Sequence, residues 1–375
     1  MKIIHIAPNS YPFLGGIEVL LKNYTKYEFE SKLNEHVITF PDRAHKFEGE
    51  FKVEGTRVIP MPVLKQKPQL PYFPKQSYRP NEIAEIFSKY KELLIREKPD
   101  IIHFHDYSEA SLPMLSISRS LNIKRLHHIH IMIDASFPAD LIANLKYERN
   151  FVAVSQAVAG SIIDEIQDDL LPIIVPNGII QEQFTRELKQ MESNPTILMA
   201  GRCVPSKGFD IGLRIFNLLL ETIPNAQLII AGYGKQFNVL KATAEEIGIS
   251  EKVRFIKGPH PSDVQKLMLK SWVTLVPSQF QEGFSLVAAE AALNGVPVLT
   301  TRVGGLPETV INGLTGLVVD PNDESAILNS LVKLLNDAKL REFLGKNAKE
   351  RAQMAFSMER FARDINNVYQ NLQNR

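Results

Sequence analysis

The chain has 375 residues, enough for two domains of ordinary size, and 44% of them are hydrophobic. Its 43 basic and 42 acidic side chains nearly cancel, so it lacks the basic footprint that nucleic-acid or anionic-membrane binding requires. No stretch approaches the roughly eighteen apolar residues of a membrane span, which leaves at most peripheral membrane contact. The single cysteine, Cys203, cannot form an internal disulfide and favours a cytoplasmic location.

Short runs rich in β-branched residues alternate with longer amphipathic stretches along the chain. The first run, M-K-I-I-H-I-A-P-N, is broken by His5 and Pro8 and is expected to be a buried strand rather than a signal peptide. The strands predicted in the first half are 3–7, 36–40, 100–104, 125–131, 152–155 and 173–175. Those in the second half are 196–200, 227–231, 253–256, 273–276, 297–300 and 316–319. This alternation predicts an α/β protein with two doubly wound parallel sheets, each covered by helices on both faces.

A boundary is expected near residue 180, where V-P-N-G at 175–178 is followed by a polar stretch. We therefore expect an N-terminal domain at 1–180 and a C-terminal domain at 181–355. Residues 356–375 form a last helical pattern whose apolar positions need a surface, which either domain could supply.

Residues 58–80 stand apart from the alternation. They carry six prolines and four basic side chains with no acidic one, so they cannot form a regular helix. The stretch is either a long crossover loop or a loop that contacts the acceptor, because long irregular insertions are often functional.

Two glycines, Gly15 and Gly16, lie between the first predicted strand and the first predicted helix. Glycines in such a turn let the backbone approach a ligand, and the helix N-terminus favours an anion there. The pattern lacks a full G-x-G-x-x-G, so ligand contact and a plain tight turn are both open.

Five of the nine histidines fall between residues 103 and 130, near the ends of two predicted strands. His128 and His130 are two apart on a strand and should share a face. Three interpretations stay open: a metal site, structural histidines, or substrate contact by one of them, for which His130 is the candidate. His103, His105, His127 and His128 receive no role.

A loop with two cations opens the second half. The segment A-G-R-C-V-P-S-K-G at 200–208 places Arg202 and Lys207 between a strand and a helix N-terminus, which suits a diphosphate. The alternative is a surface loop with two solvated cations. Lys207 is followed by Gly208 rather than by serine or threonine, so the loop is not that of a kinase or ATPase.

The most informative stretch is P-S-Q-F-Q-E-G-F-S-L-V-A-A-E-A-A-L-N-G-V-P-V at 277–298. Glu282 precedes the predicted helix and Glu290 lies within it, about 12 Å farther along the axis. That separation exceeds the roughly 5–10 Å of a carboxylate pair acting on one bond. It suits a long ligand, with a phosphate at the amides of Phe284, Ser285 and Leu286 and hydroxyl groups on either side. A small-residue helix whose glutamate pairs with a neighbouring base is the structural alternative.

These residues resemble the retaining glycosyltransferases of family 4, whose two glutamates are separated by seven residues, as Glu282 and Glu290 are. The resemblance extends along the chain through four further segments: Gly15-Gly16, Pro176-Asn177-Gly178, the 201–208 loop, and V-G-G-L-P-E at 303–308. It implies the GT-B fold, in which two Rossmann-like domains face each other across a cleft and the C-terminal helix returns to the first domain.

The resemblance also implies roles. Arg202 and Lys207 would neutralise the diphosphate of a nucleotide-sugar donor, with a uridine nucleotide favoured and no metal or cofactor required. Glu290 would hold the ribose hydroxyls and Glu282 those of the hexose, assisted by the backbone amides from Gly283 to Leu286. The remaining contacts would come from Gly16 beside the diphosphate, His130 beside the sugar, and the base-binding residues Gly232, Gly234 and Pro259.

The expected activity is transfer of a sugar, with retained anomeric configuration, to a hydroxyl of a small molecule, glycan or glycolipid. Catalysis would rest on positioning and charge stabilisation. The alternatives are a nucleotide-sugar epimerase of the same architecture, a non-catalytic nucleotide-sugar-binding protein, and a nicotinamide dehydrogenase, which the missing G-x-G-x-x-G disfavours.

Overall fold

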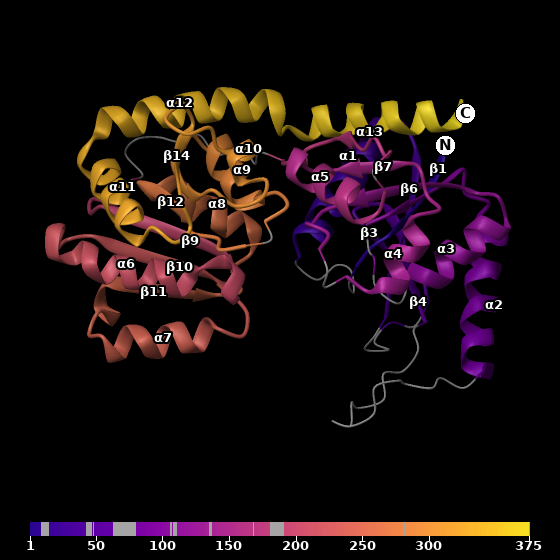
Figure 1. Cartoon of the computed structure of the whole chain (residues 1–375), viewed down its shortest axis with the longest axis horizontal. Helices are drawn as coiled ribbons and strands as arrows, with labels where there is room; N and C mark the ends of the chain where they lie inside the picture. Colours follow the sequence, from indigo (N-terminus) through magenta and orange to yellow (C-terminus); the bar gives the residue numbers. More distant parts are fainter. Residues whose placement is uncertain are drawn as a thin grey trace. The chain divides into compact units, whose positions relative to one another are not determined.

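The computed structural model describes residues 1–8, 15–42, 47, 49–62, 80–105, 107, 111–134, 137–167, 169–180, 191–280 and 282–374. Contacts divide the chain into two compact units (Figure 1). The first unit comprises Met1–Val154, Ala159–Gly178 and Phe361–Arg375, and the second comprises Ser155–Val158 and Ile179–Arg360.

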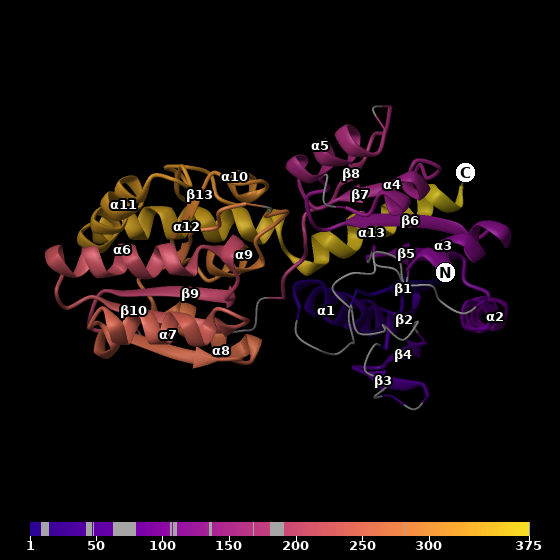
Figure 2. The same ribbon diagram turned by 60° about the horizontal axis from the view of Figure 1, so that its bottom comes forward.

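The first unit contains an eight-stranded sheet in the order β3-β4-β2-β1-β5-β6-β7-β8, which can be followed in Figure 2. Neighbouring strands are parallel except for the antiparallel pair β3 and β4. The strands are β1 (Lys2–Ile6), β2 (Glu35–Pro41), β3 (Phe51–Val53), β4 (Thr56–Met61), β5 (Ile101–Phe104), β6 (Lys124–Ile129), β7 (Phe151–Ala153) and β8 (Ile173–Ile174).

The second unit contains a six-stranded sheet in the order β11-β10-β9-β12-β13-β14, in which every pair is parallel. Its strands are β9 (Thr196–Arg202), β10 (Gln227–Tyr233), β11 (Val253–Lys257), β12 (Val273–Val276), β13 (Val298–Thr301) and β14 (Gly316–Val319). The prediction of two parallel α/β sheets is confirmed, because every run expected to form a strand lies in one of them.

Helices follow most strands, as a parallel sheet requires. They are α1 (Gly16–Ser31), α2 (Pro80–Glu97), α3 (Ser111–Ser120), α4 (Ala139–Leu145), α5 (Gln156–Glu165), α6 (Phe209–Thr222), α7 (Phe237–Glu246), α8 (Pro261–Lys270), α9 (Leu286–Leu293), α10 (Leu306–Thr309), α11 (Glu324–Asn336), α12 (Ala338–Ala355) and α13 (Met358–Gln373). None of the helices in the described ranges is long and apolar enough to cross a membrane.

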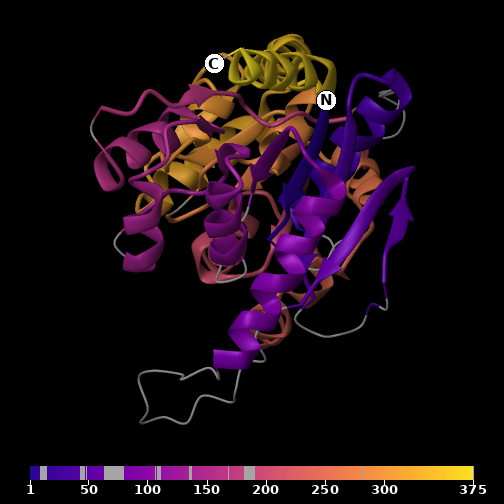
Figure 3. The same cartoon turned by 90° about the vertical axis from the view of Figure 1, so that its right-hand side faces the viewer.

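The first unit departs from the expectation at 58–80. Residues 58–61 belong to strand β4 rather than to a loop, and Pro80 already begins α2, seen in Figure 3 as a long helix beside the strands. Proline is tolerated at position 60 because β3 pairs only with Thr56–Val58, which leaves this edge of β4 without a strand partner among the described residues at residue 60. The remainder of this stretch, 63–79, lies outside the described residues.

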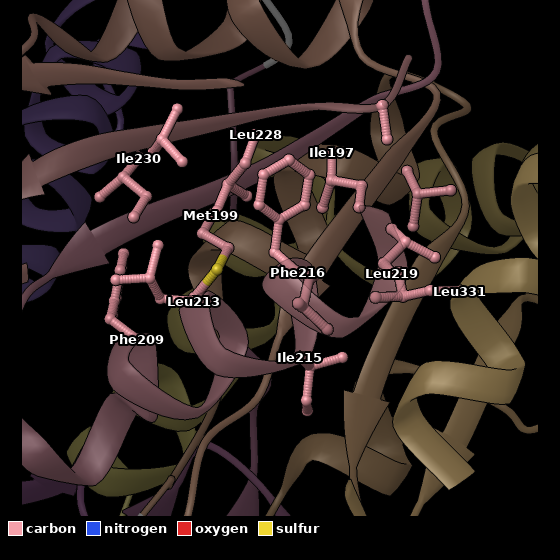
Figure 4. Close-up of a cluster of buried hydrophobic side chains, with 14 of the residues drawn as sticks. Ile197, Met199, Phe209, Leu213, Ile215, Phe216, Leu219, Leu228, Ile230 and Leu331 are labelled. Carbon is pink, nitrogen blue, oxygen red and sulfur yellow. The ribbon is translucent and has the colours of Figure 1, made fainter. Parts of the chain in front are cut away.

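Apolar side chains on one face of the second sheet form the largest core cluster, shown in Figure 4. The amphipathic helix α6 supplies Phe209, Leu213, Phe216 and Leu219, which pack against Ile197 and Met199 of β9 and Leu331 of α11. The opposite face packs against the small-residue helix α9 through Ala288 and Ala291. Small side chains there let α9 lie close to the sheet, which fixes the position of its N-terminus.

One face of the first sheet carries a cluster of imidazole rings beside aliphatic side chains such as Ile38 and Leu126. The register of β1, β2, β5 and β6 places these rings on the same face, under Tyr24 of α1 and Phe361 and Tyr369 of α13. We call this group the histidine layer; its six buried members are His5, His36, His103, His105, His128 and His130. Burial and the neighbouring rings hold the pKa values of His5, His103, His105 and His128 well below the ordinary value, so these four rings are neutral near pH 7.

Side chains of α6 should tolerate replacement by alanine only on the exposed side of the helix. Phe216→Ala is expected to lower the free energy of unfolding by about 3–5 kcal/mol, because it leaves a cavity beside β9. Leu218→Ala, at a neighbouring position that is 41% exposed, should cost less than about 1 kcal/mol. Urea unfolding followed by the fluorescence of the chain's single tryptophan, Trp272, which packs on this cluster, checks both values. Equal losses would contradict the assigned burial.

The histidine layer predicts that the first unit loses stability in mild acid. The unfolded chain takes up protons on histidine below about pH 6.5, whereas His5, His103, His105 and His128 stay neutral in the folded protein. Falling pH therefore favours unfolding by about 1.4 kcal/mol per pH unit for each of these rings. The stability is therefore complete above pH 6.5. His128→Leu should reduce this slope by one ring's share, whereas His260→Gln, at an exposed position, should not change it. Urea unfolding between pH 5 and 7.5, read by pulsed hydrogen exchange of β1 and β5, measures the slopes, and equal slopes would contradict the prediction.

Candidate functional site

The winding of the second sheet changes direction at the neighbouring strands β9 and β12. From β9 the chain continues to β10 and β11 on one side, and from β12 it continues to β13 and β14 on the other. Open α/β sheets bind ligands beyond the carboxyl ends of their strands at such a point. The two loops that start there, 203–208 and 277–285, belong to the segments that the sequence singled out.

The two loops contact each other directly. The amide of Gln279 donates a hydrogen bond of 2.8 Å to the carbonyl of Ser206. Gly208 has a φ of 64°, and a Cβ atom at this position would lie 2.0 Å from the carbonyl oxygen of Pro277. Only glycine therefore allows the first loop to pass so close to the second.

This contact joins two of the predicted site residues in one ion pair. Lys207 Nζ lies 2.5 Å from Glu282 Oε2, and the hydroxyl group of Ser278 donates a 2.8 Å hydrogen bond to the same oxygen. The Glu282 side chain is only 6% exposed, so the ammonium group offsets the cost of burying its charge. The other oxygen, Oε1, meets no donor within the described part of the chain.

The segment V-G-G-L-P-E at 303–308 holds the backbone of Glu282. The amide of Gly305 donates a 2.8 Å hydrogen bond to the Glu282 carbonyl oxygen. Gly304 has a φ of 49°, and a Cβ atom there would lie 2.1 Å from that same oxygen. The two glycines thus fix the residue whose side chain pairs with Lys207.

Gly283, whose amide the sequence analysis assigned to the donor, is buried between Glu282 and the start of α9 rather than open to solvent. The segment 303–308 packs on it as well, because a Cβ atom on Gly305 would lie 2.2 Å from the carbonyl oxygen of Gly283. Its amide donates to no backbone carbonyl in the described part of the chain. The close packing explains the position of Gly283 without any ligand. The contact between its amide and a donor stays a prediction.

Arg202, the last residue of β9, is exposed at the start of the same loop. No described residue pairs with its guanidinium group, whereas Lys207 is already engaged by Glu282. The structure therefore brings Lys207 and Glu282 together and leaves Arg202 available to an anion from outside.

Helix α9 begins beside this pair. Ser285 is its N-cap, and its hydroxyl oxygen accepts a hydrogen bond from the amide of Ala288. The amides of Phe284 and Leu286 find no acceptor among the described residues, and the ring of Phe284 packs edge-on against Phe356. Uncapped amides and the positive end of the helix dipole form a site for an anion.

Glu290 lies within α9 and is partly buried. Burial raises the pKa of its carboxyl group to about 7, and no described side chain donates to it or pairs with it. A carboxyl group that is desolvated and unpaired is a candidate for ligand contact rather than for structural support.

Close backbone packing by itself explains why glycine occupies positions 232 and 234, which were proposed for base recognition. A Cβ atom on Gly232 would lie 2.1 Å from the carbonyl oxygen of Gly201, and one on Gly234 would lie 2.6 Å from that of Cys203. Both glycines therefore bring β10 close to the loop after β9. Pro259 follows Gly258, whose amide donates to the Gly232 carbonyl at 2.8 Å, so it lies beside the same strand end.

In the first unit, Gly15 is the N-cap of α1 and Gly16 is its first residue. A Cβ atom on Gly15 would lie 2.0 Å from Glu18 Oε2, which is the far end of a flexible side chain that can move aside. Residues 9–14, the turn from β1, lie outside the described residues.

His130 lies at the end of β6 as part of the histidine layer. Its ring stacks on His128 at 4.1 Å between centroids, which confirms that these two side chains share a face. Its Nε2 lies 2.9 Å from His105 Nδ1, and burial lowers its pKa to about 3, so His130 is a neutral imidazole. His127 points to the other face, where its Nε2 lies 3.2 Å from Glu148.

The histidine layer also holds two triads whose nitrogens lie within 4.8 Å of one another: His5, His103 and His105, and His105, His128 and His130. Histidine nitrogens at such separations could hold a transition metal. The sequence pattern singles out only the histidines between residues 103 and 130. His5 and His36 carry no local signal, because their neighbours depend on which strands pair. The sequence pattern also misses Ser278, which has no motif of its own.

Comparison with known proteins matches both halves of the chain. Residues 14–183 match the model of Glycosyltransferase Family 4, and residues 180–351 match that of Glycosyl transferases group 1. The chain is 28% identical over 324 residues to a D-inositol 3-phosphate glycosyltransferase of Corynebacterium glutamicum, covering 77% of each chain. It is 26% identical over 370 residues to an uncharacterized glycosyltransferase of Methanocaldococcus jannaschii, covering 96% of each.

The fold is similar to that of solved glycosyltransferases. Anabaena HepE in complex with UDP-glucose aligns with a TM-score of 0.79 at 18% identity, over 99% of this chain and 100% of the other. The two parallel sheets, the paired family matches and this likeness agree with one another. The chain is therefore a glycosyltransferase enzyme with the GT-B fold, of the family 4 type.

Proposed function

We propose that this enzyme transfers a sugar from a nucleoside-diphosphate sugar to an acceptor hydroxyl group with retention of anomeric configuration. One observation carries the proposal: at the carboxyl ends of β9 and β12, an unpaired Arg202, the Lys207–Glu282 pair and the open amides of α9 occur together. This set offers positive charge and N–H donors for a diphosphate, with a carboxylate beside them for hydroxyl groups.

The diphosphate would be held without a metal ion. Arg202 can bind two phosphate oxygens at once, and the ammonium group of Lys207 has two further N–H donors besides the one used by Glu282. The backbone amides from Gly283 to Leu286 add the positive end of α9. Lys207 would thus keep its ion pair with Glu282 and bind the donor diphosphate at the same time.

The two carboxylates would hold hydroxyl groups at the two ends of the donor. Glu282 Oε2 is occupied by Lys207 and Ser278, which leaves Oε1 for the hexose. Glu290, unpaired and raised in pKa, would accept from the ribose hydroxyls. In this proposal the two glutamates, separated by seven residues, bind the two ends of the donor and do not act as an acid and a base on one bond.

The remaining contacts carry over from the family resemblance. Gly15 and Gly16 would offer backbone to the diphosphate, and His130 would contact the transferred sugar. The base would lie near Gly232, Gly234 and Pro259. A uridine nucleotide is favoured because the similar fold of HepE was solved with UDP-glucose. The acceptor would be a small molecule, glycan or glycolipid.

In the proposed reaction, the bond between the anomeric carbon and the phosphate oxygen breaks while the acceptor oxygen bonds to the same face of that carbon. The acceptor proton passes to the departing phosphate oxygen. Arg202, Lys207 and the amides of α9 stabilise the charge on the leaving nucleoside diphosphate, so catalysis is chiefly positioning and electrostatic.

Removing either cation should weaken binding of the nucleoside diphosphate. Arg202→Ala and Lys207→Ala should each raise Kd at least about tenfold, because a hydrogen bond to a charged group contributes about 1.5–3 kcal/mol. Lys333→Ala, at an exposed position on α11, is the control and should change nothing. Calorimetric titration with UDP, GDP, ADP and NAD measures these effects and identifies the base. Tight binding of NAD alone, or unchanged affinity in both variants, would refute the donor site.

The raised pKa of Glu290 gives donor binding a pH dependence. Its ionised form is the stronger acceptor, so affinity should be full above about pH 7 and should fall up to about tenfold per pH unit below it. Glu290→Gln should bind more weakly at pH 8 and show no such dependence, while Glu324→Gln, on the surface of α11, should behave as wild type. Binding of an intact nucleotide sugar between pH 5.5 and 8.5 is the appropriate measurement, because its esterified diphosphate does not titrate there. A wild-type profile that Glu290→Gln leaves intact would exclude the ribose role.

A further inference from the structure

Four members of the histidine layer are joined by hydrogen bonds into one continuous chain. His130 Nε2 lies 2.9 Å from His105 Nδ1, His105 Nε2 lies 3.1 Å from His5 Nδ1, and His5 Nε2 lies 2.8 Å from His36 Nδ1. The chain crosses strands β6, β5, β1 and β2 within the first unit. We refer to it as the histidine chain.

Each link joins the Nε2 atom of one ring to the Nδ1 atom of the next. A neutral imidazole carries one N–H donor and one acceptor nitrogen. Burial keeps His5, His105 and His130 neutral. With one proton on each of the four rings, a single choice of tautomer must repeat along the whole chain if all links are hydrogen bonds. Either every ring carries its proton on Nε2 or every ring carries it on Nδ1.

The two ends of the histidine chain differ in charge. At one end the buried carboxylate of Glu28 has an oxygen 3.6 Å from His36 Nε2, and the side-chain amides of Asn34 and Asn366 donate to it at 2.9 and 2.7 Å. At the other end the side chain of Asn177 faces His130. An amide can turn to donate or to accept, but a carboxylate can only accept.

The anion therefore decides the direction. At 3.6 Å the contact between His36 Nε2 and the Glu28 carboxylate is electrostatic rather than a hydrogen bond, and the negative charge favours a proton on the nitrogen that faces it. With the proton of His36 on Nε2, every link of the histidine chain must point the same way. His130 is then left with an acceptor nitrogen at Nδ1.

We propose that the histidine chain transmits the charge of Glu28 to His130 and fixes His130 as the Nε2–H tautomer, which leaves its buried Nδ1 as the acceptor nitrogen at the Asn177 end of the chain. Glu28, His36, His5 and His105 are positioning residues in this scheme. The effect on sugar transfer rests on the proposed function, in which His130 contacts the sugar. The tautomer of His130 does not depend on that proposal.

The groups packed around the histidine chain do not compete for its direction. His103 Nδ1 is 2.7 Å from the hydroxyl group of Tyr369, and His128 stacks on His103 and His130 without a described hydrogen-bond partner. Tyr24 lies edge-on to His5 and His36, and burial raises its pKa and that of Tyr369, so both phenols are neutral. The carboxylate of Glu28 lies within 4.0 Å of a ring of the histidine chain.

The decisive measurement is the tautomer of each ring in the wild-type protein. Nitrogen-15 correlation spectra of the histidine side chains at pH 7.5 should show Nε2–H at His5, His36, His105 and His130. Two neighbouring rings in opposite tautomers, or a doubly protonated ring, would overturn the proposal without any variant. So would stoichiometric binding of added Zn²⁺ that shifts His105 and His130 to metal-bound values, since those nitrogens would then be ligands.

Transmission is tested by Glu28→Gln, which keeps the shape and removes the anion. A population of the Nδ1–H tautomer should appear at His130, at the far end of the histidine chain. The control is Glu148→Gln, which removes a buried carboxylate beside His127 on the other face and should leave the His130 tautomer unchanged. If Glu28→Gln is folded and His130 stays wholly Nε2–H, Glu28 does not set the direction.

Activity separates this inference from the proposed function. Glu28→Gln should lower the turnover of sugar transfer about tenfold or more, as a wrong histidine tautomer does in other enzymes, while the Kd of the nucleoside diphosphate stays unchanged. Uniform tautomers with no nucleotide binding would refute the proposed donor site alone. Normal donor binding with mixed tautomers would refute the histidine chain alone.

Discussion

The close passage of two loops at the carboxyl ends of β9 and β12 is the constraint on which the candidate site depends. Parallel neighbouring strands lie about 4.8 Å apart, so the loops that leave them must either diverge or pack on each other. Here they pack, and Gly208 is the residue that permits it. The contact brings Lys207 to Glu282 across 75 residues of sequence. A side chain with a Cβ at residue 208 would separate the loops and leave a buried carboxylate without its cation.

The Lys207–Glu282 ion pair can still bind a ligand because not all of its hydrogen-bonding groups are engaged by the protein. A fully buried ion pair with every lone pair and proton engaged would have nothing left to offer a ligand. In this enzyme the carboxylate keeps one oxygen and the ammonium group keeps donors, while Ser278 and the backbone of Gly305 hold Glu282 in position. The pair is thus rigid toward the protein and open toward a ligand, as a preorganised site requires.

The sequence predicted the parts of the fold that depend on local pattern. Strand and helix alternation revealed both sheets, and glycine beside cations identified the two loops of the second unit. It failed where long-range pairing decides: β4 became a strand because β2 and β3 pair with it despite Pro60. His5 and His36 joined the histidine layer for the same reason. His5 links His36 to His105 only because β1 lies between β2 and β5, an order that no local pattern encodes.

The groups of the candidate donor site and the rings of the histidine chain differ in how far the protein itself supplies their partners. In the second unit the carboxylate of Glu290, the guanidinium group of Arg202 and the amides of α9 lack partners among the described residues, so a ligand would complete them. In the first unit each ring of the histidine chain is engaged by the next. Such a connected network costs stability relative to an aliphatic core, but it permits only two arrangements of its protons. A buried anion at one end is enough to choose between them, because no ring can reverse without its neighbours.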